Sequence, residues 1–471
     1  MPKLCFIRWM KTIFITSFFG LSARNILSTS ILDILRRSTD LRVVILAPQE
    51  KSDDYRRHFS SGKTNVIVEG VVLSNTRSEA TQGIQLETAS KSRLEQLFFS
   101  LFLHSSDTNS WKVMRLAERK FKGRYLKTFF HWILAKLGNF KFFRSLLRFL
   151  DYRLMPKDYY QGYFDQYRPD LIFATDIFND HDVQVMREAR ARKISIVGMV
   201  RSWDNITSHG LNRIIPDKLI VHTPKIREEA IQHNDIKLEN IFVSGIPHYD
   251  RYLSDLRTPR EQFFKQMGLD PKKKTIFFAP PSDIYAKHNP VATQVIKELS
   301  KIYDIQLIIR LYLVGEVDLG DIKTIPGKIA IDAPRQSLQF LSADIAPKED
   351  AHLADLLYHS DVVVAFASTL AIDAAVLGKP VIFIGFDGGH RPYWQSLRQY
   401  YDFDHQRFLI NTGGVKLAAS MDDLLKNIQN YLNDPDLDKK ERKNVTDLFC
   451  WKMDGRSGER AAKFLIEQFS K

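Results

Sequence analysis

The fold class of this chain is decided by one stretch, Asp361-Val-Val-Val-Ala-Phe-Ala-Ser368-Thr369-Leu-Ala-Ile-Asp373-Ala-Ala-Val-Leu-Gly-Lys-Pro-Val381. A buried apolar strand runs directly into a helix, and a second strand begins after Gly-Lys-Pro. Ser368 and Thr369 stand where the helix begins, so their hydroxyls can cap it and its free N–H groups attract an anion. We therefore expect a nucleotide diphosphate at Ser368 and Thr369, with Asp373 near a ribose hydroxyl. The alternative is an ordinary capped helix in which Asp373 only favours the helix dipole.

The same alternation of strand and helix extends along the chain on both sides of this stretch. Runs of Val, Ile and Phe separate helical segments, as in parallel βαβ units with helices on both faces of a sheet. The predicted strands are residues 13–16, 42–48, 65–73, 170–175, 194–200, 218–222, 241–244, 275–279, 306–311, 328–332, 361–367 and 381–386. The predicted fold class is α/β, with two doubly wound Rossmann-like domains facing a cleft. Ligands should bind beyond the carboxyl ends of the strands.

A chain of 471 residues has room for two or three domains, because single cores rarely exceed about 250–300 residues. The polar stretch 252–259 carries Pro259 just before the next predicted helix and is a plausible linker. We expect a first domain over residues 1–253, with an insert over about 94–160, and a second domain over 254–455. Residues 456–471 should form a C-terminal helix.

Composition excludes several classes of protein. A hydrophobic share of 44% with 26% charged residues is ordinary for a globular chain and excludes wholesale disorder or a fibrous repeat. The two cysteines, Cys5 and Cys450, are too few for a disulfide framework or a cysteine-based zinc module, which fits a reducing compartment. The sequence has no His-Glu-x-x-His and no complete Walker A motif, so we expect no metal site.

The formal net charge of +13 is concentrated in one segment. From Lys112 to Lys157 the chain has 13 Lys and Arg residues, opposed only by Glu118 and Asp151, which is +11 in 46 residues. The segment is also rich in Phe, Tyr and Trp. If residues 140–150 form a helix, one narrow arc of it carries Lys141, Arg144 and Arg148, and the opposite side carries Phe and Leu.

A basic helix with an apolar face of Phe and Leu is typical of a helix that lies on a membrane surface. We therefore predict that the segment from Lys112 to Lys157 contacts an anionic membrane surface. The alternative is a helix whose apolar face packs on the domain core while its basic face is solvated; the two interpretations are compatible. No recognisable nucleic-acid-binding module accompanies the charge, so nucleic acid is not an expected partner.

The apolar run over residues 13–21 is too short to cross a membrane, which takes about 20 residues. The segment around Gly20 and Ala23 is a poor signal-peptide cleavage site, and a β-strand explains the run better. We therefore expect a cytoplasmic protein with a peripheral contact on the inner membrane face.

Further motifs flank the opening stretch in a consistent order. They are Ser22-Ala-Arg24-Asn25, Ser244-Gly245-Ile-Pro-His-Tyr-Asp250, His352-Leu-Ala-Asp355-Leu-Leu-Tyr-His-Ser-Asp361, Gly378-Lys-Pro-Val and Asp454-Gly-Arg-Ser-Gly-Glu-Arg460. Together with the Ser-Thr turn they resemble the GT-B glycosyltransferases, nearest to the CDP-glycerol glycerophosphotransferase and related bacterial surface-polysaccharide transferases. The resemblance covers most of the chain except the basic insert.

This resemblance implies a reaction and a division of labour. The first domain would bind a glycan or lipid-linked acceptor, and the second a nucleotide-sugar donor. Sugar transfer would serve cell-envelope polysaccharide or glycolipid synthesis, without a metal ion and without a cofactor besides the donor. The donor-binding residues would be Ser368, Thr369, Asp373, His352 and Gly245.

A candidate catalytic base lies in Arg201-Ser-Trp-Asp204-Asn-Ile-Thr-Ser-His209-Gly, which follows a predicted strand. Transfer to an acceptor hydroxyl needs a carboxylate or an imidazole to take the hydroxyl proton. Asp204 is the first candidate and His209 the second; a polar turn that satisfies local backbone groups is the alternative. A weaker candidate cluster, after the preceding strand, is formed by Asp176, His181 and Asp182.

Arg310, just inside the end of a predicted strand, is expected to neutralise the leaving diphosphate in place of a metal, and a plain salt bridge is its alternative. His352 is a candidate for phosphate contact or simply a helix-capping or surface histidine.

Two departures bear on the reaction. Where glycerophosphotransferases have a basic residue and then His-Pro, this chain has Arg310-Leu-Tyr-Leu, and where they have Trp-His-Gly it has Trp203-Asp204-Asn205. The two missing histidines favour sugar transfer. Glycerophosphotransfer from a CDP-alditol, UDP-sugar 2-epimerisation and non-catalytic sugar-nucleotide binding remain as alternatives.

Overall fold

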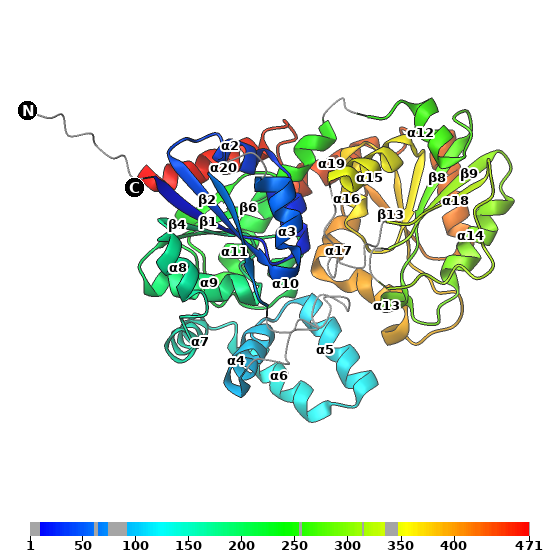
Figure 1. The fold of residues 1–471 in the computed structure, drawn as a ribbon. Helices are drawn as coiled ribbons and strands as arrows, with labels where there is room; N and C mark the ends of the chain where they lie inside the picture. The colour runs from blue at the N-terminus through cyan, green and yellow to red at the C-terminus, as the bar shows by residue number, and fades with distance from the viewer. Residues whose placement is uncertain are drawn as a thin grey trace, which may run out of the picture.

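The computed structural model describes residues 10–60, 65–73, 92–253, 257–312, 315–334 and 347–470. Within these ranges two parallel sheets organise the chain (Figure 1). The strands of the first sheet, in spatial order, are β3 (Val66–Val71), β2 (Leu41–Pro48), β1 (Lys11–Thr16), β4 (Leu171–Ala174), β5 (Ser195–Met199), β6 (Lys218–Val221) and β7 (Ile241–Val243). Those of the second are β10 (Ile329–Asp332), β9 (Ile305–Arg310), β8 (Lys274–Ala279), β11 (Val362–Ala365), β12 (Val381–Ile384) and β13 (Val415–Ala418).

The predicted α/β class with two doubly wound domains is confirmed. Each predicted strand is present with its ends within two residues of the expected positions. In both sheets the third, second and first strands of the domain lie on one side of the fourth, the Rossmann arrangement. The sequence does not predict β13, because this edge strand has only four residues, and its two middle residues, Lys416 and Leu417, are half-buried and exposed respectively.

In the first domain, the seven-stranded sheet lies between two helical layers, each with its own apolar core. One layer contains α8 (Gln161–Tyr167), α9 (Asp180–Ala191) and α11 (Pro224–Asn234). The other contains α2 (Ser30–Leu35), the preceding turn of π-helix η1 (Ala23–Leu27), and α20 (Ser457–Glu467). Short elements complete the layers: α1 (Gly20–Ser22), η2 (Gln49–Lys51), α3 (Ser52–Tyr55), η3 (Arg56–Ser60), α10 (Asn205–Ser208) and η4 (Leu238–Asn240).

The second domain has one continuous apolar core around the six-stranded sheet. Its helices are α12 (Arg260–Met267), α13 (Asp283–Ala286), α14 (Val291–Lys301), α15 (Pro347–His359), α16 (Leu370–Val376), α17 (Asp404–Ile410), α18 (Met421–Asn433) and α19 (Lys439–Phe449). The 3-10 turns η6 (Tyr393–Gln395) and η7 (Leu397–Asp402) lead into α17, and η5 (Pro247–Leu253) ends the first domain.

The predicted insert, which includes the basic segment, contains four helices between β3 and α8: α4 (Arg93–His104), α5 (Asn109–Lys122), α6 (Tyr125–Leu137) and α7 (Lys141–Leu154). We call these four helices the insert. A capping box of Ser92 and Glu95 starts α4, and Gly123, at φ +60°, ends α5. In Figure 1 the insert lies below the two sheets, away from the chain termini. Through α5 it contacts both domains, because Thr108 Oγ1 donates to the Thr207 carbonyl at 2.7 Å and the Ser110 N–H donates to Asp404 at 2.8 Å.

The last helix, α20, returns to the first domain and lies beside α2 (Figure 1). The Asp250 carboxylate caps its N-terminus by accepting the N–H groups of Ser457 at 3.0 Å and Gly458 at 2.8 Å. Phe464 stacks on Phe242 of β7 with 4.4 Å between ring centroids. The Gly-x-Pro-x-x-Asp and Asp-Gly-Arg-Ser-Gly motifs, about 200 residues apart, are thus two halves of one junction.

Candidate functional site

Three predicted site residues lie at the edges of the sheets where ligands bind in this kind of fold. In each sheet the strand order reverses between two central strands, β1 and β4 in the first and β8 and β11 in the second. Ligands bind beyond the carboxyl ends of the strands near this point. Asp176 lies two residues after β4, Asp204 lies in the segment after β5, and Ser368 lies in the turn after β11.

Asp204 is half-buried at the start of α10. Burial alone raises the pKa of its carboxyl, but the neighbouring His405 and His209, a hydrogen bond with Ser202 and the charge of Arg201 together outweigh it. The net shift of the Asp204 pKa is therefore downward. The carboxylate is ionised at neutral pH and can accept a hydrogen bond from a substrate hydroxyl.

His209 ends the same short helix as Asp204. Its Nδ1 lies 2.8 Å from the Ser208 hydroxyl and 3.3 Å from the Asn205 amide nitrogen. Burial lowers the pKa of His209, although the neighbouring Asp204 carboxylate opposes the shift. The ring is therefore neutral at neutral pH, and the structure brings the two predicted bases together around α10.

His405, on α17 of the second domain, is a site residue that the sequence did not indicate. Its ring meets Trp203 edge-to-face at 4.9 Å, and Trp203 also packs on Phe449 at 5.2 Å. Burial lowers the pKa of His405, and Asp204 again opposes the shift. Through Trp203, residues of the second domain therefore lie close to Asp204. The local sequence around His405 does not indicate this contact between the domains.

The weaker predicted cluster is only partly assembled. Asp176 pairs with Arg201, with Nε 3.1 Å from the carboxylate, and the Asp176 N–H donates to Asp182 Oδ1 at 3.2 Å. Burial and the neighbouring Asp176 carboxyl raise the pKa of Asp182 to about 8, so Asp182 is protonated at neutral pH. His181 turns toward the Tyr160 hydroxyl, 3.1 Å from its Nδ1. Asp176 and Arg201, an ion pair at the carboxyl edge of the first sheet, are the polar groups next to the Asp204 segment.

Ser368 and Thr369 form the turn between β11 and α16. The Ser368 hydroxyl accepts the Leu370 N–H at 3.2 Å, and Thr369 stands at the N-cap without a side-chain hydrogen bond. Ala367, just before them, has φ +27°, an unusual conformation for a residue with a Cβ. Within the described part of the chain the backbone N–H groups of Ser368 and Thr369 donate to no acceptor, so they are available to an anion.

Asp373 is buried in a polar cluster between the domains. Arg24, from η1 of the first domain, donates to Asp350 of α15 at 2.7 Å and to the Tyr252 hydroxyl at 3.2 Å. Its guanidinium also lies 3.7 Å from Asp373. Burial raises the pKa of Asp373 to about 6 in spite of Arg24. The structure therefore places Asp373 at the junction of the two domains, where Arg24 ties them together.

Arg310 and His352 are joined through one carboxylate, that of Asp332. Arg310 ends β9 and forms an ion pair with Asp332 at the end of the neighbouring β10. His352 Nε2 lies 2.9 Å from the other Asp332 oxygen. Burial raises the pKa of Asp332, but His352 and Arg310 outweigh it and the net shift is downward. The salt bridge expected in the alternative interpretation of Arg310 is thus present, at the carboxyl edge of the second sheet.

Gly245 lies against α20. Its φ is +83°, and a Cβ there would stand 2.5 Å from the Ser457 hydroxyl and 3.0 Å from Arg460 Nη2. Arg460 in turn donates from Nε to the Ser244 carbonyl at 2.8 Å. This position needs glycine both for its backbone conformation and for the close approach of the C-terminal helix.

We expect Gly245→Ala to lower the free energy of unfolding by about 1–3 kcal/mol, because the backbone is held in the left-handed region and Ser457 must move. The matched control is Gly162→Ala in α8, where no other atom lies within 4 Å of the new Cβ. That control should be neutral or stabilising by up to about 1 kcal/mol. Guanidinium unfolding of both variants makes the comparison, and equal stability of the two would contradict the docking role of Gly245.

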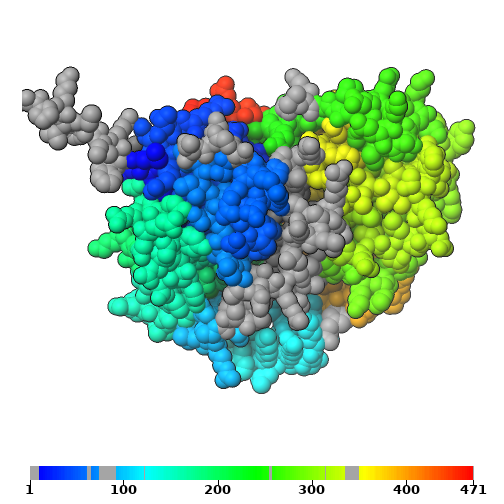
Figure 2. Space-filling model, viewed as in Figure 1, coloured from blue at the N-terminus to red at the C-terminus, as the bar shows by residue number. Residues whose placement is uncertain are grey.

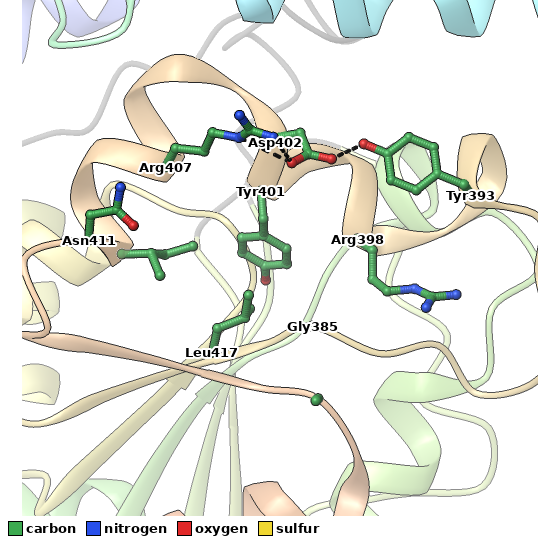
Figure 3. A pocket seen from close by; sticks show the side chains of 10 residues that line it. Gly385, Tyr393, Arg398, Tyr401, Asp402, Arg407, Asn411 and Leu417 are labelled. Atoms are coloured by element: carbon green, nitrogen blue, oxygen red, sulfur yellow. Dashed lines mark hydrogen bonds and ion pairs between the residues drawn. The ribbon is translucent and has the colours of Figure 1, made fainter.

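A pocket of about 500 Å³ lies beyond the carboxyl ends of β12 and β13 (Figure 3). Asp402 stands at its rim and accepts hydrogen bonds from Tyr393 and from Arg407, the latter at 2.6 Å. None of the predicted site residues lines it. Tyr401, in its wall, connects it to the Ser368 turn, because its hydroxyl donates to the Ile384 carbonyl at 2.7 Å and accepts the Ala367 N–H at 3.4 Å.

Among the residues that the structure describes, no group of three or more His, Cys, Asp or Glu side chains is arranged to hold a metal ion. In the same ranges no helix is both long enough and apolar enough to cross a bilayer.

Comparison with a family model supports the resemblance seen in the motifs. Residues 335–467 match the model of CDP-Glycerol:Poly(glycerophosphate) glycerophosphotransferase. The matched range contains the Ser368 turn and all of α20. No curated protein matches the chain by sequence.

Solved structures match the chain along nearly its whole length. The UDP-GlcNAc 2-epimerase from Neisseria meningitidis bound to UDP-GlcNAc has a TM-score of 0.53 and 12% identity, covering 97% of this chain and 100% of that one. The S. aureus MnaA–UDP complex has a TM-score of 0.54 and 11% identity, covering 98% and 97%. The crystal structure of the glycotransferase of kitacinnamycin has a TM-score of 0.51 and 12% identity, covering 98% and 99%. The protein has the GT-B fold. At these identities the GT-B structures show the fold alone, and the family model adds support for a transferase.

Proposed function

We propose that this GT-B protein is a glycosyltransferase that moves a sugar from a nucleotide-sugar to a glycan or lipid-linked acceptor in cell-envelope polysaccharide or glycolipid synthesis. The observation that carries the proposal is Asp204, an ionised carboxylate beyond the first sheet that interacts with His405 of the second domain. The family match over the second domain and the solved GT-B structures that bind UDP-GlcNAc and UDP support a nucleotide-sugar as donor.

In the proposed reaction the donor diphosphate binds at the N–H groups of Ser368 and Thr369. Asp204 takes the proton of the acceptor hydroxyl while the acceptor oxygen forms a bond to the anomeric carbon. The bond from that carbon to the diphosphate breaks, and a nucleoside diphosphate leaves. His209 is the second candidate for the base. We further propose that no metal ion and no cofactor besides the donor takes part.

Glycerophosphotransfer from a CDP-alditol is the second candidate, and the family match is the observation that favours it. Against it, Arg310 stands where that family has a basic residue followed by His-Pro, and here Leu311 and Tyr312 follow. The 2-epimerases share the fold, and their reaction is a third alternative. A non-catalytic sugar-nucleotide-binding protein would use the same donor site without turnover.

A thermal-shift panel of UDP, CDP, GDP, their common nucleotide-sugars and CDP-glycerol tests the proposal. A nucleotide-sugar at one hundred times its Kd should stabilise the purified protein by about 2.7 kcal/mol. Thr369→Pro removes one of the two free N–H groups and should therefore weaken the thermal shift. Thr324→Pro, at an exposed loop position, is the matched control.

Turnover of the stabilising donor, with and without EDTA, separates the alternatives. Release of a nucleoside diphosphate that survives EDTA supports metal-independent sugar transfer. Stabilisation by CDP-glycerol alone would move the assignment to glycerophosphotransfer, and interconversion of epimers would move it to the epimerases. If no nucleotide stabilises the protein, the donor site proposed here is wrong.

A further inference from the structure

Helix α6 exposes its large apolar side chains, which is the reverse of an ordinary surface helix. The side chains that it buries are those of Thr128, His131 and Ala135. Large apolar side chains lie on its outside, with exposed fractions of 72% for Leu126, 54% for Phe129, 56% for Phe130, 51% for Trp132 and 38% for Leu137. Surface helices of globular proteins normally turn their apolar stripe inward, so a contiguous exposed stripe of this kind marks an interaction surface.

Helix α7 also differs from what its sequence predicted. The basic arc of Arg144 and Arg148 does not face solvent: both side chains are about 11–12% exposed and pair with Asp235, at 2.5 and 2.7 Å. Arg148 also donates to the Asn212 side chain at 2.9 Å. These ion pairs dock α7 on the first domain. Two of its aromatic side chains therefore turn outward, Phe142 at 80% and Phe149 at 56% exposed.

We call the exposed apolar side chains of α6, of the turn after it and of α7 the outer helical surface; they are Leu126, Phe129, Phe130, Trp132, Leu137, Phe140, Phe142, Leu146 and Phe149. In Figures 1 and 2 the insert that carries it forms the lower end of the molecule. Phe129 lies 6.2 Å from Phe130 and 6.3 Å from Trp132, ring centre to ring centre, so the aromatic side chains of α6 form one cluster.

Positive charge predominates around the outer helical surface, and part of it is paired. Glu118 forms ion pairs with Arg115, Arg124 and Lys127. Asp107 pairs with Lys112 and Lys136, and Asp151 is held by two arginines of the first domain. Lys120, Lys122 and Lys141 are exposed and have no ion-pair partner among the described residues. The apolar surface is thus flanked by cations that no acid of the segment neutralises.

We propose that the outer helical surface docks the protein on an anionic lipid bilayer, with its Phe, Trp and Leu side chains inserted at the boundary between headgroups and acyl chains. Apolar insertion combined with cations that meet anionic headgroups is how interfacial helices bind. A second copy of the chain is a poor occupant, because its own exposed lysines, Lys120, Lys122 and Lys141, would face those of this one. The contact would be peripheral, and we place it on the inner membrane face.

Docking through the outer helical surface would also fix the position of the cleft between the domains relative to the bilayer. Helix α5 of the insert contacts Thr207 of α10, next to Asp204, and Asp404 of α17, next to His405. A bilayer held by the insert would therefore lie near the segments that carry Asp204 and His405, which suits the lipid-linked acceptor of the proposed function. Bilayer binding itself needs neither donor nor turnover, so its test is independent of the proposed reaction.

Flotation of the full-length protein with vesicles tests the apolar part of the proposal. Wild type should float with phosphatidylcholine vesicles that contain 30% phosphatidylglycerol. Leu126→Ser combined with Phe142→Ser should lower the bound fraction at least about tenfold, because two exposed apolar side chains can no longer insert. The matched control is Leu238→Ser with Tyr303→Ser, an equally exposed Leu and aromatic pair outside the insert, which should float as wild type does.

The charge part is tested with the exposed lysines only, because Arg144 and Arg148 hold α7 to Asp235. Each Lys near an anionic surface contributes about fivefold to binding, so the reversal Lys120→Glu, Lys122→Glu and Lys141→Glu should lower binding to anionic vesicles about a hundredfold or more. Reversal of three exposed lysines of the second domain, Lys272→Glu, Lys297→Glu and Lys323→Glu, is the control.

Three outcomes would overturn the proposal. The first is that wild type does not float with anionic vesicles. The second is that the variant with Leu126→Ser and Phe142→Ser floats as wild type does. The third is that reversing the three lysines of the insert leaves vesicle binding unchanged. Light scattering coupled to gel filtration measures the oligomeric state and so tests the alternative that a second copy of the chain binds this surface. A wild-type dimer that this apolar variant converts to a monomer, without vesicle binding, would assign the surface to self-association.

Discussion

The Asp151→Ala variant should lose about 3–5 kcal/mol of the free energy of unfolding, because it leaves the buried Arg187 without its ion-pair partner and leaves Arg213 with Asp180 alone. Asp151 is fully buried at the end of α7. Its carboxylate accepts hydrogen bonds from Arg187 at 2.7 Å and from Arg213 at 2.6 and 3.1 Å. The Arg187 side chain is 1% exposed, so water cannot take the place of the carboxylate.

Guanidinium unfolding followed by tryptophan fluorescence measures this loss. The control is Asp165→Ala, which breaks an exposed pair with Arg192 and should cost less than about 1 kcal/mol. Asp151→Asn keeps an oxygen acceptor but removes the charge, and its stability should lie between wild type and Asp151→Ala. If Asp151→Ala does not fold, the Asn variant carries the comparison. Equal stability of Asp151→Asn and the control would contradict the anchoring role of Asp151.

The Asp204→Asn variant should lower kcat by about 10²–10⁴ while the melting temperature stays close to that of wild type. The amide has the shape of the carboxylate but cannot take the acceptor proton, and general-base catalysis contributes a factor of this size. The donor identified by thermal shift serves as substrate, and donor binding by the variant should be unchanged. Asp422→Asn, at an exposed position on α18, is the control that should keep full activity.

The pH profile of wild type distinguishes Asp204 from His209. The pKa of the Asp204 carboxyl is lowered, so the carboxylate stays ionised throughout the range above about pH 4, where ordinary carboxyls titrate. With Asp204 as the base, kcat/KM should therefore hold from neutral pH down to about pH 5. Because the pKa of His209 is lowered from 6.5, a loss of activity already centred between about pH 5 and 6.5 would point to its imidazole instead.

The strands were predictable because each is a short apolar run with its own boundaries. Residues 361–367 and 13–16 are examples, since neither depends on a distant partner for its apolar character. The edge strand β13 was missed for the opposite reason: at four residues, with Lys416 inside it, it is a strand mainly because β12 pairs with it.

The candidate site was predictable only in its local parts. Asp204 and Ser368 could be proposed from the sequence because each follows a strand end, which is a local pattern. The contacts between the two domains could not be predicted: His405 meets Trp203 across the cleft, and Arg24 meets Asp350 over a separation of 326 residues. No spacing in the sequence records such a contact.

The order of amino acids alone was sufficient for the α/β class, the strands and the concentration of charge between Lys112 and Lys157. Periodicity along one element carries this information, because neighbouring residues on a helix or strand share a face. Which face meets the protein was decided by tertiary structure. In α7 the arginines turned inward because Asp235 offered them a partially buried carboxylate, and that left Phe142 and its neighbours outside. An amphipathic pattern indicates that the two faces of a helix differ. Which face is buried depends on the groups that the rest of the protein places beside it, here the carboxylate of Asp235.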